Sequence, residues 1–400
     1  MPHSAPSAPP VEDRRSPFVR LADLLADIAP GRAPLSAAVG EPQHAMPGFV
    51  QPVLDASLAG FGRYPRAEGL PAFRKAAAAW LDRRYDIGRP VDADKEVLVL
   101  NGSREGLVNA AVVAKRRVAE RPGRPVMLLP NPFYAAYAAG AELAGCEAVV
   151  MPTTRDSGWL PDLDALAPEL LARTVAVFLA SPANPQGAVA SRDYLKRLLA
   201  LTRAHGAYLF ADECYSEVYL SEKAPAGILE ACDGDFTGAV AFNSLSKRSS
   251  LPGLRCGFCA GDADFLKEYL AFRWVAAPQV PEPLQMVGIA ALEDEAHVEA
   301  SRALYKAKFD LADGLLQGRF GYERPEGGFF LWLDVSAVGG GEEAALRLWR
   351  EQGLRTVPGG YLARRDADGI NPGDAYLRVA LVQDLPTCEE VLKRLVAGLS

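Results

Sequence analysis

The sequence is poor in the residues on which several classes of protein depend. Six cysteines and four histidines among 400 residues exclude a disulfide-rich secreted scaffold, and no histidine is placed to make a visible Ser/His or Cys/His catalytic pair. No apolar run approaches the roughly 18–20 residues that a membrane-spanning helix needs. A formal net charge of −7 argues against nucleic acid as the main partner. We therefore expect a cytoplasmic protein with small-molecule partners and no membrane attachment.

The composition is otherwise that of an ordinary globular chain. It is 49% hydrophobic and 23% charged over 400 residues, which is enough for more than one core. Residues 1–16 are rich in proline, serine and alanine and lack the apolar centre of a signal peptide. They predict a disordered tail.

Two cysteines have the spacing of a metal site, in Cys256-Gly257-Phe258-Cys259. The segment has the pattern of a strand, in which residues three apart point to opposite faces. No second cysteine pair or histidine cluster accompanies it. The sequence therefore predicts no metal site.

Short apolar runs alternate with helical patterns through the first two thirds of the chain. This alternation predicts a mostly parallel sheet covered by helices. The predicted strands are Val97–Leu100, Val126–Leu129, Ala148–Met151, Val175–Ala180, Tyr208–Phe210, Ala239–Phe242 and Cys256–Ala260.

The remainder of the chain predicts a smaller α+β domain. Leu284 to Phe320 has apolar residues at helical spacing and no proline, so we expect one long helix that joins two domains. We expect a large domain over residues 51–283 and a small domain over 17–50 and 284–400. Its other predicted elements are strands Phe329–Val335, Arg355–Val357 and Tyr376–Val382 and helices Glu342–Gln352 and Thr387–Leu399.

The segment from Ser244 to Arg255 suggests a pyridoxal phosphate pocket. Lys247 stands between Ser246 and Ser249, and an arginine follows eight residues later. The lysine can form a Schiff base with the cofactor aldehyde, while the serines Ser244 and Ser246 and Arg255 can donate to its phosphate.

Two predicted strands deliver further polar groups to the edge of the sheet where ligands bind. Asp212 follows the strand that ends at Phe210, and Asn184 follows the strand that ends at Ala180. A carboxylate facing the pyridine nitrogen keeps it protonated, which is the task that Asp212 suits. Neutral donors stabilise the cofactor's phenolate oxygen, and Asn184 and Tyr215 are the candidates.

Together these motifs resemble the fold-type I pyridoxal-phosphate-dependent aminotransferases of class I/II, from about Pro17 to the C-terminus. The resemblance implies a mostly parallel seven-stranded sheet in an α/β/α sandwich, with a smaller α+β domain. The run at 256–260 would pair antiparallel, as in the family. The active unit would be a homodimer.

The resemblance also assigns further site residues. Backbone amides of Ser103 and Arg104 would meet the phosphate at a helix N-terminus, and Tyr134 would stack on the pyridine. Tyr64 would reach the phosphate of the neighbouring subunit. Arg378 would clamp the substrate α-carboxylate, assisted by Asn184 and the backbone amide of Gly40. Lys247, Asp212 and Tyr215 would be the catalytic residues.

Within the family, several stretches resemble the bacterial succinyldiaminopimelate aminotransferases of lysine biosynthesis: Pro130–Tyr134, Leu245–Ser249, Asp294–Val298, Pro358–Leu362 and Asn371–Gly373. The implied donor is N-succinyl-LL-2,6-diaminopimelate, with 2-oxoglutarate as acceptor. Arg248 and Arg273 are candidates for binding its remaining carboxylates. Trp274–Pro278 departs from that subgroup, which has a polar stretch there. This departure favours a less polar donor.

Three alternatives therefore stay open. One is an aminotransferase for another amino acid, such as aspartate, an aromatic amino acid or acetylornithine. Another is a carbon–sulfur lyase, because the cofactor residues do not distinguish transfer from elimination. The third is an effector-sensing domain of a transcription regulator. That hypothesis requires an additional N-terminal DNA-binding domain, and the roughly 16 residues before the resemblance are too few to form one.

Overall fold

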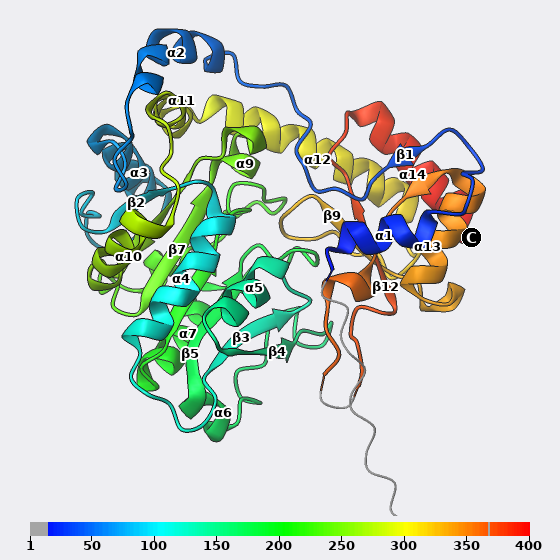
Figure 1. Cartoon of the computed structure of the whole chain (residues 1–400). Helices are drawn as coiled ribbons and strands as arrows, with labels where there is room; N and C mark the ends of the chain where they lie inside the picture. The colour runs from blue at the N-terminus through cyan, green and yellow to red at the C-terminus, as the bar shows by residue number, and fades with distance from the viewer. Residues whose placement is uncertain (1–14, 367–368) are drawn as a thin grey trace, which may run out of the picture.

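The computed structural model describes residues 15–366 and 369–400, so the predicted tail lies almost entirely outside the described residues. A seven-stranded sheet with helices on both faces forms the larger part of the molecule, and a smaller α+β part lies beside it (Figure 1). The strand order in the large sheet is β2-β8-β7-β6-β5-β3-β4. Its strands are β2 (Val97–Leu100), β3 (Val126–Asn131), β4 (Glu147–Pro152), β5 (Thr174–Ala180), β6 (Tyr208–Asp212), β7 (Ala239–Ser244) and β8 (Gly257–Gly261).

The seven predicted strands are confirmed, each within about two residues of its expected bounds. β8 runs antiparallel to both of its neighbours, β2 and β7, and the remaining pairings are parallel. The central strands are continuous apolar runs because helices bury both of their faces. The parallel strands β5 and β6 therefore end at the same edge of the sheet.

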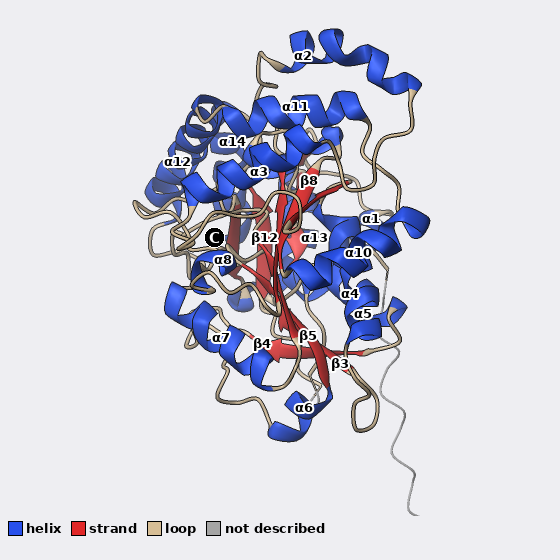
Figure 2. Cartoon of the chain, turned by 90° about the vertical axis from the view of Figure 1, so that its left-hand side faces the viewer, coloured by secondary structure: helices blue, strands red, loops and turns tan. Residues whose placement is uncertain are grey.

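Helices cover the sheet as an α/β/α sandwich (Figure 2). One core contains side chains of α3 (Pro71–Arg84), α7 (Arg192–Ala204) and α11 (Glu282–Glu293). The core on the other face contains side chains of α4 (Ser103–Arg117), α5 (Ala135–Leu143) and α10 (Ala263–Ala276). Cys256 lies in the first core and Cys259 in the second. The two thiols thus lie on opposite faces of the sheet and cannot share a metal ion.

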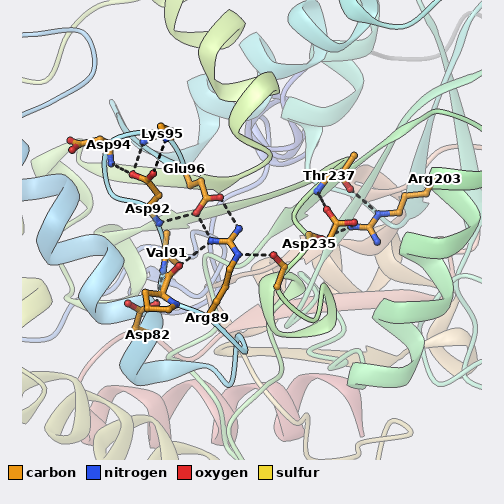
Figure 3. A network of polar contacts seen from close by, with 12 residues as sticks. Asp82, Arg89, Val91, Asp92, Asp94, Lys95, Glu96, Arg203, Asp235 and Thr237 are labelled. Carbon is orange, nitrogen blue, oxygen red and sulfur yellow. Dashed lines mark hydrogen bonds and ion pairs between the residues drawn. The ribbon is translucent and has the colours of Figure 1, made fainter.

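A polar network anchors the start of edge strand β2 (Figure 3). Arg89 donates to both carboxylate oxygens of Glu96, at 2.9 and 2.7 Å, and to the carbonyl of Gly234 at 2.7 Å. Glu96 in turn accepts from the backbone amide of Asp92. These bonds fix the loop before β2 to the loop that precedes β7.

The smaller part is built on a three-stranded sheet of order β11-β12-β9. Its strands are β9 (Phe330–Asp334), β11 (Val357–Pro358) and β12 (Tyr376–Ala380), and a separate pair joins β1 (Leu35–Ser36) to β10 (Leu354–Arg355). The single strand expected at residues 355–357 is wrong, because buried Thr356 separates two short strands of different sheets. The covering helices are α1 (Pro17–Leu25), α13 (Gly341–Gln352) and α14 (Leu385–Leu399).

The predicted long helix over 284–320 is also wrong, because it is two helices, α11 and α12 (Ala296–Leu316). Asp294 ends α11 with extended backbone, and its carboxylate accepts from the backbone amide of His297 at 3.0 Å. An acidic side chain that caps the next helix breaks the apolar periodicity. Side chains of α11 pack in the core on one face of the large sheet, so this helix belongs with the large domain. We therefore propose that the border between the domains lies near Asp294.

The remaining described elements are short and connect these layers. No helix within residues 15–366 and 369–400 is long and apolar enough to cross a membrane. The connecting elements are α2 (Val50–Ser57), η1 (Leu58–Gly62), α6 (Pro168–Arg173), α8 (Ile228–Ala231), α9 (Leu245–Arg248), η2 (Pro252–Leu254), η3 (Ser336–Val338) and η4 (Gly359–Leu362).

Candidate active site

Asp212, at the carboxyl end of β6, is a buried carboxylate. It accepts a hydrogen bond from the hydroxyl of Tyr137 at 2.7 Å and one from the backbone amide of Cys214 at 3.2 Å. Burial raises the pKa of Asp212, against the effect of these bonds and of the charge of Lys247. No cation among the described residues forms an ion pair with it within 4 Å. The carboxylate is therefore available to a charged ligand.

Lys247 lies on α9, directly after β7. Its ammonium donates to the carbonyl of Gly40, a residue that comes from the N-terminal segment. Burial lowers the pKa of Lys247 to about 8, which makes its amine a far better nucleophile near neutral pH than an exposed lysine. A Cβ on Gly40 would lie 2.4 Å from the ring of Phe330. Any other residue at this position would therefore require the Phe330 ring to move.

A cluster of donors lies beside Lys247, where β7 meets the N-terminus of α4. Ser244 donates to the hydroxyl of Ser246 at 2.9 Å, and Arg255 donates to the carbonyl of Asn101 at 3.1 Å. Gly102 precedes α4 with a φ of 81°, and a Cβ there would lie 2.4 Å from the Arg255 guanidinium. No side chain of the described residues caps α4, so the first backbone amides of the helix, from Ser103 on, can bind an anion.

Arg104 and Tyr134 lie together at this edge. The Arg104 guanidinium donates to the Tyr134 hydroxyl, and the Tyr134 ring packs edge-on against Tyr137 with centroids 5.7 Å apart. Cys214 extends the same group, since its thiol lies 2.8 Å from the hydroxyl of Ser103. The structure therefore links the predicted phosphate and ring residues to the surroundings of Asp212.

Arg378, on β12, is a buried arginine that forms no ion pair with a carboxylate of the described residues. Its guanidinium donates to the side-chain oxygen of Asn184 at 3.2 Å and to the carbonyl of Ala38 at 2.8 Å, and within residues 15–366 and 369–400 its Nε has no hydrogen-bond partner. The group lies 4.3 Å from the centroid of the Phe330 ring. Only 4% of the residue is exposed, and burial lowers the pKa of Arg378 to about 10.

Tyr215 lies beside Lys247, in an aromatic group with Phe329 and Phe330. Its ring lies edge-on to Phe329 at 5.3 Å, and the Lys247 ammonium lies 5.9 Å from its centroid. Burial raises the pKa of Tyr215 well above its ordinary value. The phenol therefore stays protonated and can donate a hydrogen bond to a ligand.

Three predicted residues lie elsewhere. Tyr64 is 98% exposed on the surface. The assignment of Arg248 and Arg273 to the substrate carboxylates is wrong. Arg248 is buried against Glu295 and the carbonyl of Ala291, and Arg273 is buried against Glu105. Both guanidiniums already pair with internal carboxylates, and their remaining role is structural.

Tyr137, whose hydroxyl contacts Asp212, was not predicted from the sequence. The available signal was a second tyrosine three residues after Tyr134, in the first turn of α5. Phe330 was also missed, because a strand residue against an arginine has the same pattern as any core aromatic.

Comparisons with known proteins find similarity to one family of enzymes. A family model described as aminotransferase class I and II matches residues 38–395. The LL-diaminopimelate aminotransferase of Syntrophobacter fumaroxidans is 31% identical over 83% of this chain and 82% of its own length. An aminotransferase from Neisseria meningitidis is 37% identical with a TM-score of 0.90, over 96% of this chain and 98% of that chain. A probable N-succinyldiaminopimelate aminotransferase from Thermus thermophilus is 26% identical with a TM-score of 0.83, over 96% and 100%.

Proposed function

Because the chain belongs to the class I and II aminotransferases, which depend on pyridoxal phosphate, we propose that it moves the amino group of N-succinyl-LL-2,6-diaminopimelate to 2-oxoglutarate. Amino transfer itself follows from the family. The donor, the roles of the individual residues and a cytoplasmic location are the parts that we propose. The observation that carries the binding of an amino-acid substrate is Arg378, which is buried beside Asn184 and has no ion pair among the described residues. The names of the diaminopimelate relatives support the donor.

The residues present fit pyridoxal phosphate. Asp212 is a buried carboxylate without an ion pair among the described residues, which suits a protonated ring nitrogen. The hydroxyls of Ser244 and Ser246, the uncapped start of α4 and Arg255 suit a phosphate. Burial lowers the pKa of the Lys247 amine to about 8. More of the amine is therefore neutral near pH 7, and the neutral form is the one that reacts with an aldehyde.

Each residue then has one task. Pyridoxal phosphate, when bound, supplies the electron sink that stabilises negative charge developing at the substrate Cα. Asp212 would hold the proton at the ring nitrogen. Lys247 would bond the cofactor at rest and, once released as a free amine, would move the proton at the substrate Cα. Tyr215 and Asn184 would donate to the ring oxygen, and Tyr134 would cover the ring.

Arg378 would fix the orientation of the substrate. A guanidinium binds a carboxylate through two parallel hydrogen bonds, which sets direction as well as distance. Because the Arg378 fork is buried, water does not compete for it, and Phe330 holds it from one side. The substrate Cα would then face Lys247, which is the arrangement that amino transfer needs.

The names of the diaminopimelate relatives support a long donor with an α-amino carboxylate at the reacting end and a second polar end, which is a free amino acid in LL-2,6-diaminopimelate and a succinylated one in its N-succinyl derivative. Arg248 and Arg273 do not serve that end, since each is buried against an internal carboxylate. Trp274 and Val275 are exposed at the end of α10. If they reach a neighbouring subunit's site, they present it with an apolar surface.

The test compares kcat/KM with 2-oxoglutarate for N-succinyl-LL-2,6-diaminopimelate, LL-2,6-diaminopimelate, aspartate, glutamate, acetylornithine and an aromatic amino acid. The proposal requires polar groups that pair with the succinylated end, and such groups would be left unpaired with any other donor. The succinylated donor should then exceed the others by about a hundredfold or more. Preference for an apolar or aromatic donor would overturn this assignment and favour the Trp274–Pro278 departure.

The same assay separates transfer from elimination. Amino transfer produces glutamate in step with the consumption of donor and depends on the added 2-oxo acid. A carbon–sulfur lyase releases pyruvate and ammonia from a cysteine-type substrate without an acceptor. Release of this kind at rates above transfer would contradict the proposal.

A further inference from the structure

We infer that Asn131 is a positioning residue that latches the small-domain loop after β11 onto the end of β3 and so sets the place of Arg378 relative to the cofactor residues. The inference rests on amino transfer and on Arg378 as the carboxylate clamp. It does not depend on which donor is preferred.

The side chain of Asn131 bonds both backbone groups of one residue across the domain border. Its amide nitrogen donates to the carbonyl of Arg364 at 2.8 Å, and its oxygen accepts from the amide of Arg364 at 3.0 Å. A third bond runs beside them, from the amide of Phe133 to the carbonyl of Leu362 at 3.0 Å. The contact thus extends the end of β3 with three hydrogen bonds to the other domain.

The chemistry of the site requires an asparagine. Asn131 is fully buried, so each of its polar atoms must have a partner. A carboxamide has a donor nitrogen and an acceptor oxygen at the same end, which match the carbonyl and the amide of a single backbone residue. An aspartate keeps the shape but would place an acceptor against the Arg364 carbonyl.

The Asn131 latch, which consists of its two hydrogen bonds to Arg364, lies between two parts of the active site. On the small-domain side, β11 pairs with β12 so that Val357 stands opposite Arg378, and the loop that reaches Asn131 follows β11 directly. On the other side, Tyr134 lies three residues after Asn131. In Figure 1 the arrowheads of β3 and β4 point toward the small domain, in agreement with these bonds.

Arg364 adds a second contact at the same place. Its guanidinium lies 5.3 Å from the centroid of the Phe133 ring and 3.4 Å from the carboxylate of Glu142 on α5. This surface pair is screened by solvent and contributes little by itself. At this contact between the domains, the buried bonds of Asn131 therefore contribute more than the exposed pair.

The test uses holoenzyme with Asn131→Ala and the best donor found by assay. Losing two buried bonds should raise KM for the amino donor and for 2-oxoglutarate together by about tenfold, with kcat changed less than about threefold. Both substrates respond because both use Arg378. Affinity for an unreactive dicarboxylate, followed by the absorbance of the bound cofactor, should fall by the same factor, while pyridoxal phosphate affinity stays unchanged.

Thr153→Val is the matched control. Thr153 donates to the Asn131 carbonyl at 2.9 Å and accepts from Gln186 at 2.9 Å, so this variant also loses two bonds at the same strand end, but none that crosses the border. It should lower the melting temperature and leave both KM values unchanged. Equal effects of the two variants on KM, or unchanged KM in Asn131→Ala, would overturn the inference.

Asn131→Asp covers the case in which the alanine variant does not fold. The aspartate keeps an acceptor for the Arg364 amide, but its second oxygen would repel the Arg364 carbonyl. Both KM values should therefore rise at least as much as in Asn131→Ala. The rise should become smaller at a pH low enough to protonate the aspartate. An aspartate variant with wild-type KM values would equally contradict the latch. If the wild type prefers a donor other than the succinylated one, the proposed donor fails and this test proceeds with the preferred donor.

Discussion

At the scale of single residues, the site holds two opposite charges apart, each buried and without an ion pair among the described residues. Asp212 is stabilised by two hydrogen bonds, and Arg378 by two acceptors and an aromatic ring. An unpaired buried charge is costly in a folded protein. The cost is removed when ligands pair with both groups, a cationic ring nitrogen with Asp212 and a carboxylate with Arg378.

The lowered pKa of Lys247 predicts the pH dependence of cofactor capture. The neutral amine is the form that reacts with an aldehyde, and burial lowers its pKa to about 8. The rate of covalent bonding to apoenzyme should therefore rise about tenfold per pH unit below pH 8 and level off above it. Stopped-flow absorbance measures this rate. A plateau reached only near pH 10 would show that burial does not activate the lysine.

The covalent link itself identifies the lysine. Borohydride reduction of the holoenzyme followed by peptide mapping should place the pyridoxyl label on Lys247 alone. Lys247→Ala should abolish turnover and labelling while it still binds the cofactor through phosphate contacts. A label on any other lysine contradicts the assignment.

Asp212 and Arg255 should separate catalysis from affinity. Asp212→Asn removes the charge that holds the ring proton, so turnover at saturating cofactor should fall by orders of magnitude. Arg255→Ala removes a charge-assisted phosphate bond and should weaken cofactor affinity by about 2 kcal/mol, with turnover restored at high cofactor concentration. Equilibrium dialysis and saturation kinetics distinguish them. Near-wild-type turnover in Asp212→Asn would exclude its role.

At the scale of elements, the Gly40–His44 segment is held at both ends by lysines. Lys247 donates to Gly40, while Lys308 on α12 lies 2.8 Å from the Nε2 of His44. The Nδ1 of His44 lies 2.9 Å from the hydroxyl of Ser301. Burial, and then the charge of Lys308, lower the pKa of His44 from 6.5 to about 4. The histidine is therefore neutral in the folded protein.

This predicts a loss of stability on acidification. Between pH 6.5 and pH 4 the unfolded chain protonates His44 and the folded chain does not, so stability falls as the pH falls and is unaffected above 6.5. After solvent screening we expect about 1 kcal/mol between pH 7 and pH 5. Urea unfolding at both pH values should show a smaller loss in His44→Gln than in the wild type. Equal losses would mean that His44 titrates normally.

The sequence predicts the large sheet better than the connections between its parts. Strands such as Val97–Leu100 are buried on both faces, so local composition alone defines them. The break at Asp294 had a local signal in its capping side chain, but the apolar periodicity on either side outweighed it. The bond from Asn131 to Arg364 spans 233 residues, and only the tertiary structure brings those residues together.

The candidate site likewise has residues whose positions could be predicted from the sequence and residues whose roles could not. Lys247 and Asp212 follow strands, and parallel strands bring their ends together, so their proximity could be expected from sequence. The Arg248 and Arg273 assignments failed because charge alone does not distinguish a ligand-binding guanidinium from one paired internally with Glu295 or Glu105.

At the scale of the whole molecule, the exposed apolar side chains indicate a partner. Met46, Phe61 and Tyr64 lie in one stretch of sequence, and each is more than half exposed, as is Val275 at the end of α10. A second copy of the chain is the partner that the family resemblance implies. We propose that Tyr64 completes the phosphate site of that second copy, because it is 98% exposed on its own subunit.

Mixed dimers test this sharing directly. Tyr64→Ala should weaken pyridoxal phosphate affinity by about tenfold through loss of one phosphate contact, and Lys247→Ala should be inactive. When the two variants are unfolded together and refolded, a hybrid places both defects in one site and leaves the other with an intact Lys247 and the partner's intact tyrosine. At a limiting cofactor concentration the mixture should recover activity that neither homodimer has, in proportion to the hybrid fraction. No recovery, with hybrids verified by differently tagged chains, would mean that Tyr64 does not serve the neighbouring site.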